Sequence, residues 1–353
     1  MAELASVAEM QPLFVEVLKL CGVKSNEKVA VLSEGGLAQA YSMTFMAAVA
    51  ALDAEPVRVN VAATSDAGAE ARIANLGRSA LSTDAAAMRS LKQADLVIDL
   101  MLLLFSREQI EIQKSGARIL MVVEPFEVLQ RLMPNPSMRA RVEAAERRMQ
   151  AAKTLRFTND AGTDLHYELK ALNGPPPECI LTEYGYTDTP GRWDHWPSGF
   201  LASTGTVTGV EGTVVMNAGD IVLPWKQFLK TPVEFKISNG KVTDINGEED
   251  ARRLRDYIEG FNDPRAYAVS HIGWGLNEDA LWAVDVPGIA MDSRAYYGNV
   301  LFSLGPNTEF GGANDTACHL DLPMKNCSLW LDDDLIVSRG EVLPNDMRAL
   351  NSA

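Results

Sequence analysis

The segment KVAVLSE, residues 28–34, decides the fold class of the first half of the chain. Its central residues are all apolar, which is typical of a parallel strand that is buried on both faces. A helical pattern runs from about Val7 to Cys21 before it, and an alanine-rich helical pattern runs from about Ala38 to Asp53 after it. Helices that alternate with buried strands predict an α/β fold with a mainly parallel sheet.

The same alternation continues to about residue 150. Three further strands are expected in the segments PVRVNVA, ADLVIDLM and ARILMVVE, at residues 56–62, 94–101 and 117–124. Gly35 and Gly36 follow the first strand, but they lack the GxGxxG or GxxxxGKS/T spacing of a phosphate loop, so we interpret them as a turn. We therefore expect an N-terminal α/β domain over residues 1–153.

The pattern changes after a highly charged helix that is expected over residues 137–153. Segments such as VEFKISNGKVTDING, residues 233–247, alternate apolar and polar residues and break at Asn-Gly, which is a hairpin signal. We therefore expect residues 154–353 to form a β-rich α+β domain of mainly antiparallel strands.

Composition narrows the classes of function. The chain has 353 residues, of which 32 are basic and 47 acidic, for a net charge of −15. This excess of acidic residues disfavours binding to nucleic acids and anionic membranes, so a small organic substrate is the better hypothesis. The most apolar run, LVIDLMLLLF at 96–105, contains Asp99 and is well short of the roughly 20 residues that span a bilayer.

The N-terminus and the cysteines indicate a cytoplasmic protein. The first segment lacks the basic start, the apolar core and the small-residue cleavage site of a secretory signal peptide. The four cysteines, Cys21, Cys179, Cys318 and Cys327, form no CxxC pair, which fits a reducing compartment better than a disulfide framework.

Three side chains offer a candidate metal site. His319 and Asp321 are two residues apart in an apolar segment, so on a strand their side chains lie on one face. His271 ends another apolar segment, before Gly273 and Gly275. Two histidines and one carboxylate are the ligand set of non-haem Fe(II) oxygenases, although zinc hydrolases use similar ligands. The other interpretation of His319 and Asp321 is a structural hydrogen-bonded pair.

A second group of polar and aromatic side chains lies within residues 181–200. It consists of Glu183, Tyr184, Arg192, Trp193, Asp194, His195 and Trp196. Indole rings suit stacking on a planar heteroaromatic ring, and His195 or Glu183 suits proton transfer. The alternative is a tryptophan-rich loop that packs on the sheet and leaves His195 exposed. Ser303 is a further candidate for the same cavity, whereas His166, on an alternating strand, is expected to be structural.

Three motifs together resemble the bacterial 2,5-dihydroxypyridine 5,6-dioxygenases: PGRWDHWPSG at 190–199, HIGWGLN at 271–277 and NDTACHLDLPM at 314–324. That family is similar in fold to the M29-type metalloaminopeptidases. The resemblance implies that His271, His319 and Asp321 bind one Fe(II). It also implies a homo-oligomeric enzyme that uses O2 to open 2,5-dihydroxypyridine between C5 and C6, giving N-formylmaleamate.

The resemblance further implies roles for individual side chains. His195 and Glu183 match catalytic residues on the substrate side of the site, and the residues expected to bind the substrate are Trp193, Trp196, Arg192 and Ser303. Arg192 is the candidate cation for the carboxylate of a substituted substrate. A second histidine that is expected shortly after His195 in that family is absent here, and Ser198 stands near its place.

Two other classes of function stay open. An aminopeptidase of the M29 type holds two ions about 3.5 to 4 Å apart, which requires more ligands than one His-His-Asp set. Glu183, Glu309 or Asp315 would have to supply them. The second class is a non-catalytic protein that binds a metal or a ligand.

Overall fold

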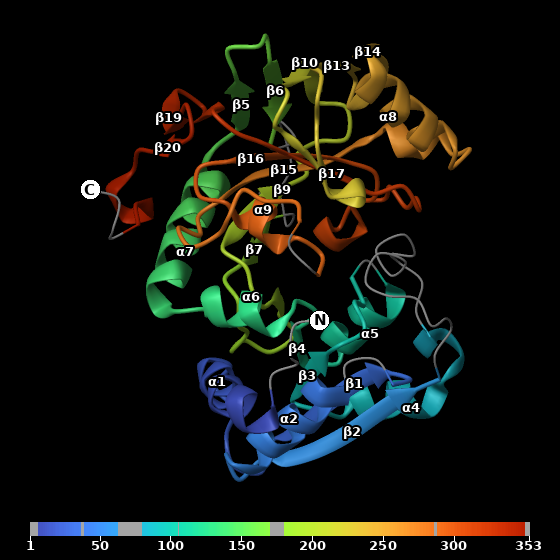
Figure 1. Ribbon diagram of the computed structural model, residues 1–353, viewed down its shortest axis with the longest axis vertical. Helices are drawn as coiled ribbons and strands as arrows, with labels where there is room; N and C mark the ends of the chain where they lie inside the picture. The colour runs from blue at the N-terminus through green and yellow to red at the C-terminus, as the bar shows by residue number, and fades with distance from the viewer. Residues whose placement is uncertain are drawn as a thin grey trace. The chain divides into compact units, whose positions relative to one another are not determined.

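The chain forms two compact units. The computed structural model describes residues 6–36, 39–62, 80–104, 106–169, 180–285 and 288–349 (Figure 1). The first unit draws on residues 1–135, 183–198 and 287–289, and the second on residues 136–182, 199–286 and 290–353. This division differs from the expected single boundary at residue 153, because the chain returns to the first unit after residue 182.

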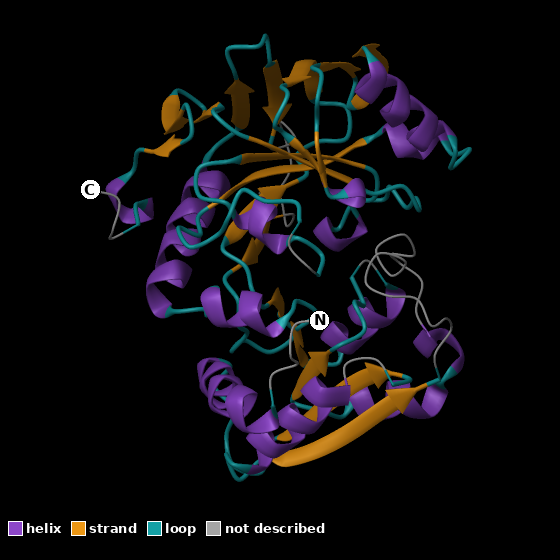
Figure 2. Cartoon of the chain, in the orientation of Figure 1, coloured by secondary structure: helices purple, strands orange, loops and turns teal. Residues whose placement is uncertain are grey.

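The first unit alternates helices and strands, as Figure 2 shows. Its elements are α1 (Val7–Leu20), β1 (Lys28–Glu34), α2 (Gln39–Ala50), β2 (Glu55–Val61), η1 (Ala80–Thr83), α4 (Ala85–Lys92), β3 (Leu96–Asp99), α5 (Arg107–Lys114), β4 (Arg118–Met121), α6 (Phe126–Arg131) and β8 (Trp193–His195). The strands lie in the order β2-β1-β3-β4-β8, and each neighbouring pair is parallel. The expected parallel sheet is confirmed.

Burial explains why the strands of this sheet are continuous apolar runs. β3 and β4 are buried at every position. Asp99, at the end of β3, is fully buried and accepts hydrogen bonds from the N–H groups of Met101 and Leu103, each at 2.8 Å. These bonds offset the cost of burying a carboxylate, so Asp99 is compatible with an apolar strand.

The edge strand β8 was not expected from the sequence. Its three residues pair in parallel with β4, from Ile119 opposite Trp193 to Met121 opposite His195. All three residues of β8 are buried. A strand this short shows no alternation of apolar and polar residues, which is why the segment resembles a loop in the sequence.

The second unit is rich in β-structure. Its elements are α7 (Pro136–Ala151), β5 (Thr154–Thr158), β6 (Asp164–Glu168), β7 (Ile180–Glu183), β9 (Phe200–Ser203), β10 (Val210–Met216), β11 (Ile221–Val222), η2 (Leu223–Trp225), β12 (Gln227–Phe228), β13 (Val233–Ser238), β14 (Lys241–Gly247), α8 (Glu249–Glu259), η3 (Pro264–Tyr267), β15 (Val269–Gly275), α9 (Met291–Ala295), β16 (Val300–Leu304), η4 (Thr308–Phe310), β17 (Leu320–Met324), β18 (Ser328–Leu331), β19 (Asp334–Ser338), β20 (Glu341–Val342) and η5 (Asn345–Met347).

Two larger sheets organise these strands. One has the order β14-β13-β10-β6-β5-β18-β19-β20 and is antiparallel throughout. Its β13–β14 hairpin turns at Asn239 and Gly240, whose φ angles of 52° and 71° are those that a two-residue hairpin turn of type I′ requires. The other sheet has the order β17-β16-β15-β9-β7. The expected combination of an α/β part and a β-rich α+β part is therefore confirmed.

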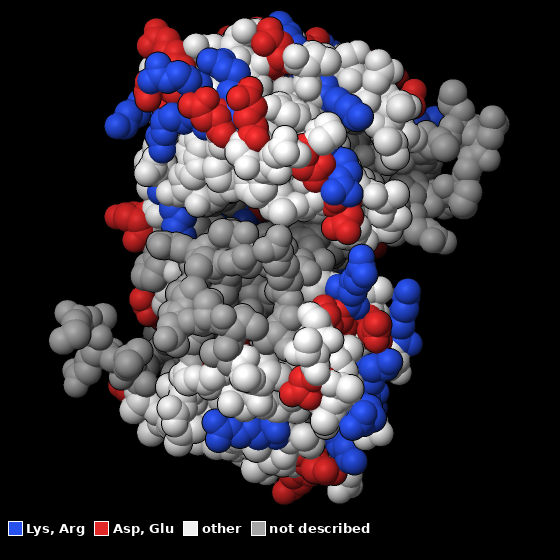
Figure 3. All heavy atoms as spheres, turned by 90° about the vertical axis from the view of Figure 1, so that its right-hand side faces the viewer, with Lys and Arg blue, Asp and Glu red and all other residues white. Residues whose placement is uncertain are grey.

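The described surface is mixed in charge, and the described cysteines are buried. Figure 3 shows acidic and basic side chains interspersed on one face of the molecule.

Cys21, Cys318 and Cys327, here called the three buried thiols, are all free. None of the helices within the described ranges is long and apolar enough to cross a membrane.

Candidate metal centre and catalytic residues

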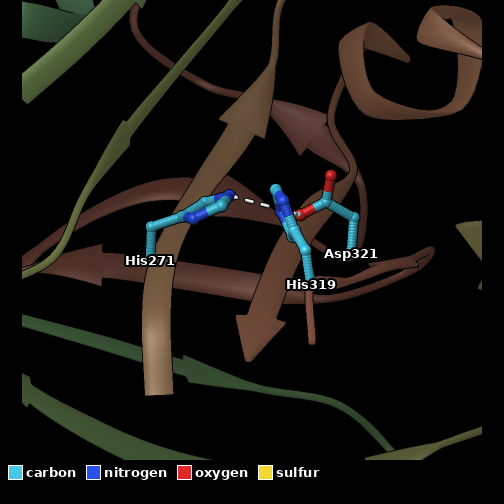
Figure 4. Close-up of side chains that lie close together, drawn as sticks. All are labelled: His271, His319 and Asp321. Atoms are coloured by element: carbon cyan, nitrogen blue, oxygen red, sulfur yellow. Dashed lines mark hydrogen bonds and ion pairs between the residues drawn. The ribbon is translucent and has the colours of Figure 1, made fainter. Parts of the chain in front are cut away.

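His271, His319 and Asp321 converge in the second unit, as expected from the sequence (Figure 4). His271 belongs to β15 and Asp321 to β17, and His319 directly precedes β17. The side-chain nitrogen and oxygen atoms that each residue offers all lie within 4.8 Å of one another. Within the described part of the chain, this is the one group of three or more His, Cys, Asp or Glu residues with that spacing.

One carboxylate oxygen lies at the centre of the group. The Oδ1 atom of Asp321 is 3.0 Å from Nε2 of His319 and 3.4 Å from Nε2 of His271. The rings of the two histidines are nearly perpendicular, at 85°. Two imidazole nitrogens and a carboxylate oxygen thus point at a common space, which is a donor set that suits a divalent transition metal.

The position of Ser270 fixes the tautomer of His271. The Ser270 hydroxyl is 2.9 Å from Nδ1 of His271 and also donates a hydrogen bond to the carbonyl oxygen of Pro306. Since a hydroxyl has one proton, Nδ1 of His271 must be the donor to Ser270. The lone pair of the neutral ring is then on Nε2, which is the atom that faces Asp321.

This arrangement suits a bound cation. Burial lowers the pKa of His271 and favours the neutral ring, although Asp321 acts in the opposite direction. A neutral Nε2 and a carboxylate Oδ1 both present lone pairs to each other at 3.4 Å. A metal ion between them removes that repulsion, so the three residues fit a bound metal.

Asp321 is held in its charged form by its neighbours. Burial would raise its pKa, but the neighbouring His319, Arg294 and His271 outweigh burial and hold the pKa well below its usual range. Arg294, on α9, lies 2.6 Å from Oδ2. The Ser303 hydroxyl lies 2.8 Å from Oδ1 and 2.9 Å from the carbonyl oxygen of Leu320. Ser303, expected to bind the substrate, thus also contacts the carboxylate of Asp321.

Three residues of the centre were not predicted from the sequence: Ser270, Arg294 and Phe310. The ring of Phe310 stacks on His271, with ring centroids 4.9 Å apart and planes 26° apart. Phe310 also belongs to a buried apolar cluster with Phe200, Ala202, Met291 and Leu301. No local motif predicts these residues. The fold brings Arg294 and Phe310 to the group, and Ser270 contacts His271 through one side-chain hydrogen bond.

Glu183, His195 and Ser198 belong to the first unit. All three side chains are buried. The Ser198 hydroxyl donates a 2.9 Å hydrogen bond to the Glu183 carboxylate. The residue that stands near the expected second histidine therefore contacts the proposed acid or base directly.

Asp194 links the backbones that carry Glu183 and His195. Its fully buried carboxylate accepts hydrogen bonds from the N–H groups of Tyr184 at 3.2 Å, Gly185 at 2.9 Å and His195 at 2.8 Å. Arg192, expected to anchor a substrate carboxylate, instead forms a 2.6 Å ion pair with Asp194. Burial raises the pKa of Asp194, and Arg192 acts in the opposite direction.

The two tryptophans of this segment differ. Trp196 is fully buried and its ring packs edge-on against Phe14 of α1, with centroids 5.7 Å apart, while His195 is buried too. Trp193 lies beside His195, with ring centroids 6.4 Å apart. Its indole N–H is buried and has no hydrogen-bond partner among the described atoms.

Other candidates lie apart from the group. His166 is 62% exposed and lies 3.3 Å from Asp164 on the surface of β6, so its setting differs from that of a buried ligand. Asp315 is not part of the His271, His319 and Asp321 group. The side chain of Glu309 lies outside the described residues.

Comparisons with known proteins identify the family. The family model described as 2,5-dihydroxypyridine 5,6-dioxygenase matches residues 9–344. A protein of that name from Pseudomonas putida is 44% identical over 352 residues, which cover 98% of this chain and 99% of the relative. The solved structure of 2,5-dihydroxypyridine dioxygenase from P. putida KT2440 has a TM-score of 0.91 at 43% identity, over 98% of this chain and 100% of that one.

A more distant structure shares the fold. AmpT from Thermus thermophilus has a TM-score of 0.55 at 12% identity, over 95% of this chain and 100% of that one. This likeness shows the fold alone, and it agrees with the expected relation to the M29 type. Since the family model and the P. putida relative both span nearly the whole chain, the chain belongs to the 2,5-dihydroxypyridine 5,6-dioxygenase family.

Proposed function

We propose that the chain is a non-haem Fe(II) dioxygenase that opens 2,5-dihydroxypyridine between C5 and C6 and gives N-formylmaleamate. One observation carries the proposal: Nε2 of His271, which holds the lone pair of the ring, faces the Asp321 carboxylate beside His319. Membership of the family supports the choice of substrate. The reaction balances, because both atoms of one O2 enter the product: one joins C5 and the other joins C6.

We assign His271, His319 and Asp321 as the iron ligands. Ser270 keeps Nε2 of His271 available, because its hydroxyl oxygen accepts a hydrogen bond from Nδ1–H. When bound, Fe(II) supplies the electrons that make O2 reactive toward the pyridine ring. Two histidines and one carboxylate leave coordination positions open for ligands that are not protein.

The other side chains are assigned to the substrate. The two hydroxyls of 2,5-dihydroxypyridine are para to each other, so they cannot chelate one ion as adjacent oxygens do, and the protein has to orient the ring. His195 or Glu183 takes the hydroxyl proton, which moves electron density into the ring. Trp193 offers a buried indole N–H, and Ser303 offers a hydroxyl next to Asp321.

We assign Arg192 and Trp196 to the support of the segment that carries His195. Arg192 is paired with Asp194, and Trp196 is packed against Phe14. Both therefore stabilise the segment that carries His195. Because Arg192 is already paired with Asp194, this arrangement suits an unsubstituted dihydroxypyridine, which has no carboxylate to bind.

We also infer a cytoplasmic location and a homo-oligomer. The three buried thiols are free, which agrees with a reducing compartment. The homo-oligomer follows from the family resemblance, and light scattering of the purified protein measures it directly.

The decisive experiment is O2 uptake by anaerobically purified protein that has been reconstituted with Fe(II). The protein is given 2,5-dihydroxypyridine while the loss of pyridine absorbance is followed. We expect one O2 consumed per ring opened, and no uptake after a chelator removes the iron. Uptake that persists in the His319→Ala variant at the wild-type rate would refute the assigned metal site.

A separate outcome would point to the hydrolase class. In that case the protein would consume no O2 and would release amino acids from small peptides in the presence of Zn(II) or Co(II). The described residues offer a single three-residue metal group, so the dioxygenase is the better supported function.

A further inference from the structure

We propose that Arg294 is a positioning residue for the metal centre, and that its charge keeps the bound iron in the Fe(II) state. The inference rests on the proposed function, because it requires iron at His271, His319 and Asp321. It concerns how the protein protects that iron from oxidation between turnovers.

The two oxygens of Asp321 have different neighbours. Oδ2 lies 2.6 Å from Nε of Arg294. Oδ1 lies 3.0 Å from His319, 3.4 Å from His271 and 2.8 Å from Ser303. Arg294 engages Oδ2, so Oδ1 is the oxygen that faces the histidines. This arrangement favours Asp321 as a one-oxygen ligand of an ion between the histidines.

Arg294 is itself held in place. The side-chain amide of Asn299 donates hydrogen bonds to the carbonyl oxygens of Ser293 and Arg294, at 2.7 and 3.1 Å. Asp292 accepts a 2.8 Å bond from the N–H of Leu281. These bonds fix the short helix α9, so the Arg294 side chain starts from a rigid backbone.

The Arg294 charge lies in a setting where it is weakly screened. Its side chain is 15% exposed, and the side chain of Asp321 is 4% exposed. Charges interact more strongly away from water than in it. The guanidinium offsets the carboxylate, so with neutral histidines the ligand sphere and its closest cation add no net negative charge to the metal.

The consequence follows from the charge of the two iron states. Fe(III) carries one positive charge more than Fe(II), so a fixed cation nearby disfavours Fe(III) and raises the reduction potential. Removal of that cation lowers the potential and makes the resting enzyme easier to oxidise in air. A dioxygenase that must meet O2 as Fe(II) benefits from this protection.

The test separates charge from hydrogen bonding with two variants. Arg294→Gln keeps an amide donor for Oδ2 but loses the charge, whereas Arg294→Lys keeps the charge. Both are loaded anaerobically with Fe(II), and the Fe(III)/Fe(II) potential is measured by redox titration that follows the electron paramagnetic resonance of Fe(III). Arg339→Gln, which removes a 70% exposed arginine of the same unit, is the matched control.

We expect the glutamine variant to favour Fe(III) by at least about tenfold, which is about 59 mV for a one-electron couple. We expect the lysine and Arg339→Gln variants to stay within about threefold of the wild type. A wild-type potential in Arg294→Gln would overturn the inference. So would a folded glutamine variant that does not retain iron, because the amide donor should still hold Asp321.

The remaining outcomes are also decisive. If Arg294→Gln does not fold, the lysine variant decides: a shift of about tenfold in it would contradict a role for the charge, and an unchanged potential would support one. Wild-type protein that binds no iron would refute the proposed function itself. That failure is distinct from a failure of the inference, which appears only in iron-loaded protein.

Discussion

The replacement of Asp194 by asparagine tests how the first unit holds the proposed catalytic residues. The substitution Asp194→Asn keeps the size of the side chain but removes its charge. The new amide nitrogen would face backbone N–H groups or the guanidinium of Arg192, which are all donors. Asp194→Asn therefore removes the carboxylate that pairs with the half-buried Arg192 guanidinium, and it removes the acceptor of at least one N–H group.

The structure gives the magnitude of this effect. Removal of one partner from a buried ion pair costs about 3–5 kcal/mol. Arg192 is 20% exposed at its side chain and lies 4.2 Å above the ring of Tyr184, so water and the ring compensate part of the loss. We therefore expect a loss near the lower end, about 3 kcal/mol of unfolding free energy.

Urea denaturation of the wild type and Asp194→Asn measures this free energy, and metal analysis and O2 uptake are made on the same samples. We expect iron content to stay unchanged, because the ligands belong to the second unit. We expect turnover to fall by about tenfold to a hundredfold, because a shift of about 1 Å in Glu183 or His195 is enough for such a loss.

The result that would refute this reasoning is a loss of less than about 1 kcal/mol. Burial raises the pKa of Asp194, and a protonated carboxyl would resemble an amide, so the asparagine would then cost little. We expect the ionised form instead, because the hydrogen bonds described for both carboxylate oxygens come from N–H donors. The experiment therefore also reports the charge state of this residue.

Three further predictions concern the metal centre and the thiols. His319→Ala should lose bound iron while His195→Ala should retain it and turn over more slowly; metal analysis and O2 uptake distinguish them, and iron loss in His195→Ala would contradict the assigned roles. Ser270→Ala should weaken Fe(II) affinity about tenfold to a hundredfold in chelator competition, because the ring proton loses its acceptor; Ser42→Ala, which removes a buried hydroxyl without a hydrogen-bond partner among the described atoms, should not. In a Cys179→Ser variant, the three buried thiols should react with a disulfide reagent at pH 8 only after urea is added, because burial raises their pKa values. Rapid reaction of this variant in its folded state would contradict the prediction.

Much of the fold follows from local patterns in the sequence. Continuous apolar runs predicted the parallel strands, and an Asn-Gly pair predicted the β13–β14 hairpin. The strand β8 escaped because three residues show no periodicity, and its pairing with β4 joins segments about 70 residues apart in the chain. Discontinuous units of this kind depend on long-range contacts that no local pattern expresses.

The candidate metal centre, too, was predicted from the sequence only in part. The spacing of His319 and Asp321 was visible because alternate residues of an extended segment share a face, although β17 itself begins only at Leu320. The contact of Arg294 with Asp321 spans 27 residues and joins a short helix to a strand. Ser270 directly precedes His271, yet adjacent residues of a regular strand point to opposite faces, so their contact could not be expected from the sequence.

An irregularity in the sheet explains that contact. Val269 pairs with Leu304 and Ile272 pairs with Phe302, so three steps along β15 match two steps along β16. The extra residue of such a bulge changes the direction of the side chains next to it. Ser270 and His271 can therefore meet, and the hydroxyl can fix the ring while Nε2 faces Asp321. The bulge brings together two neighbouring residues of one strand, the proposed metal ligand His271 and its support Ser270, so Ser270 is as much a part of the candidate centre as the three proposed ligands.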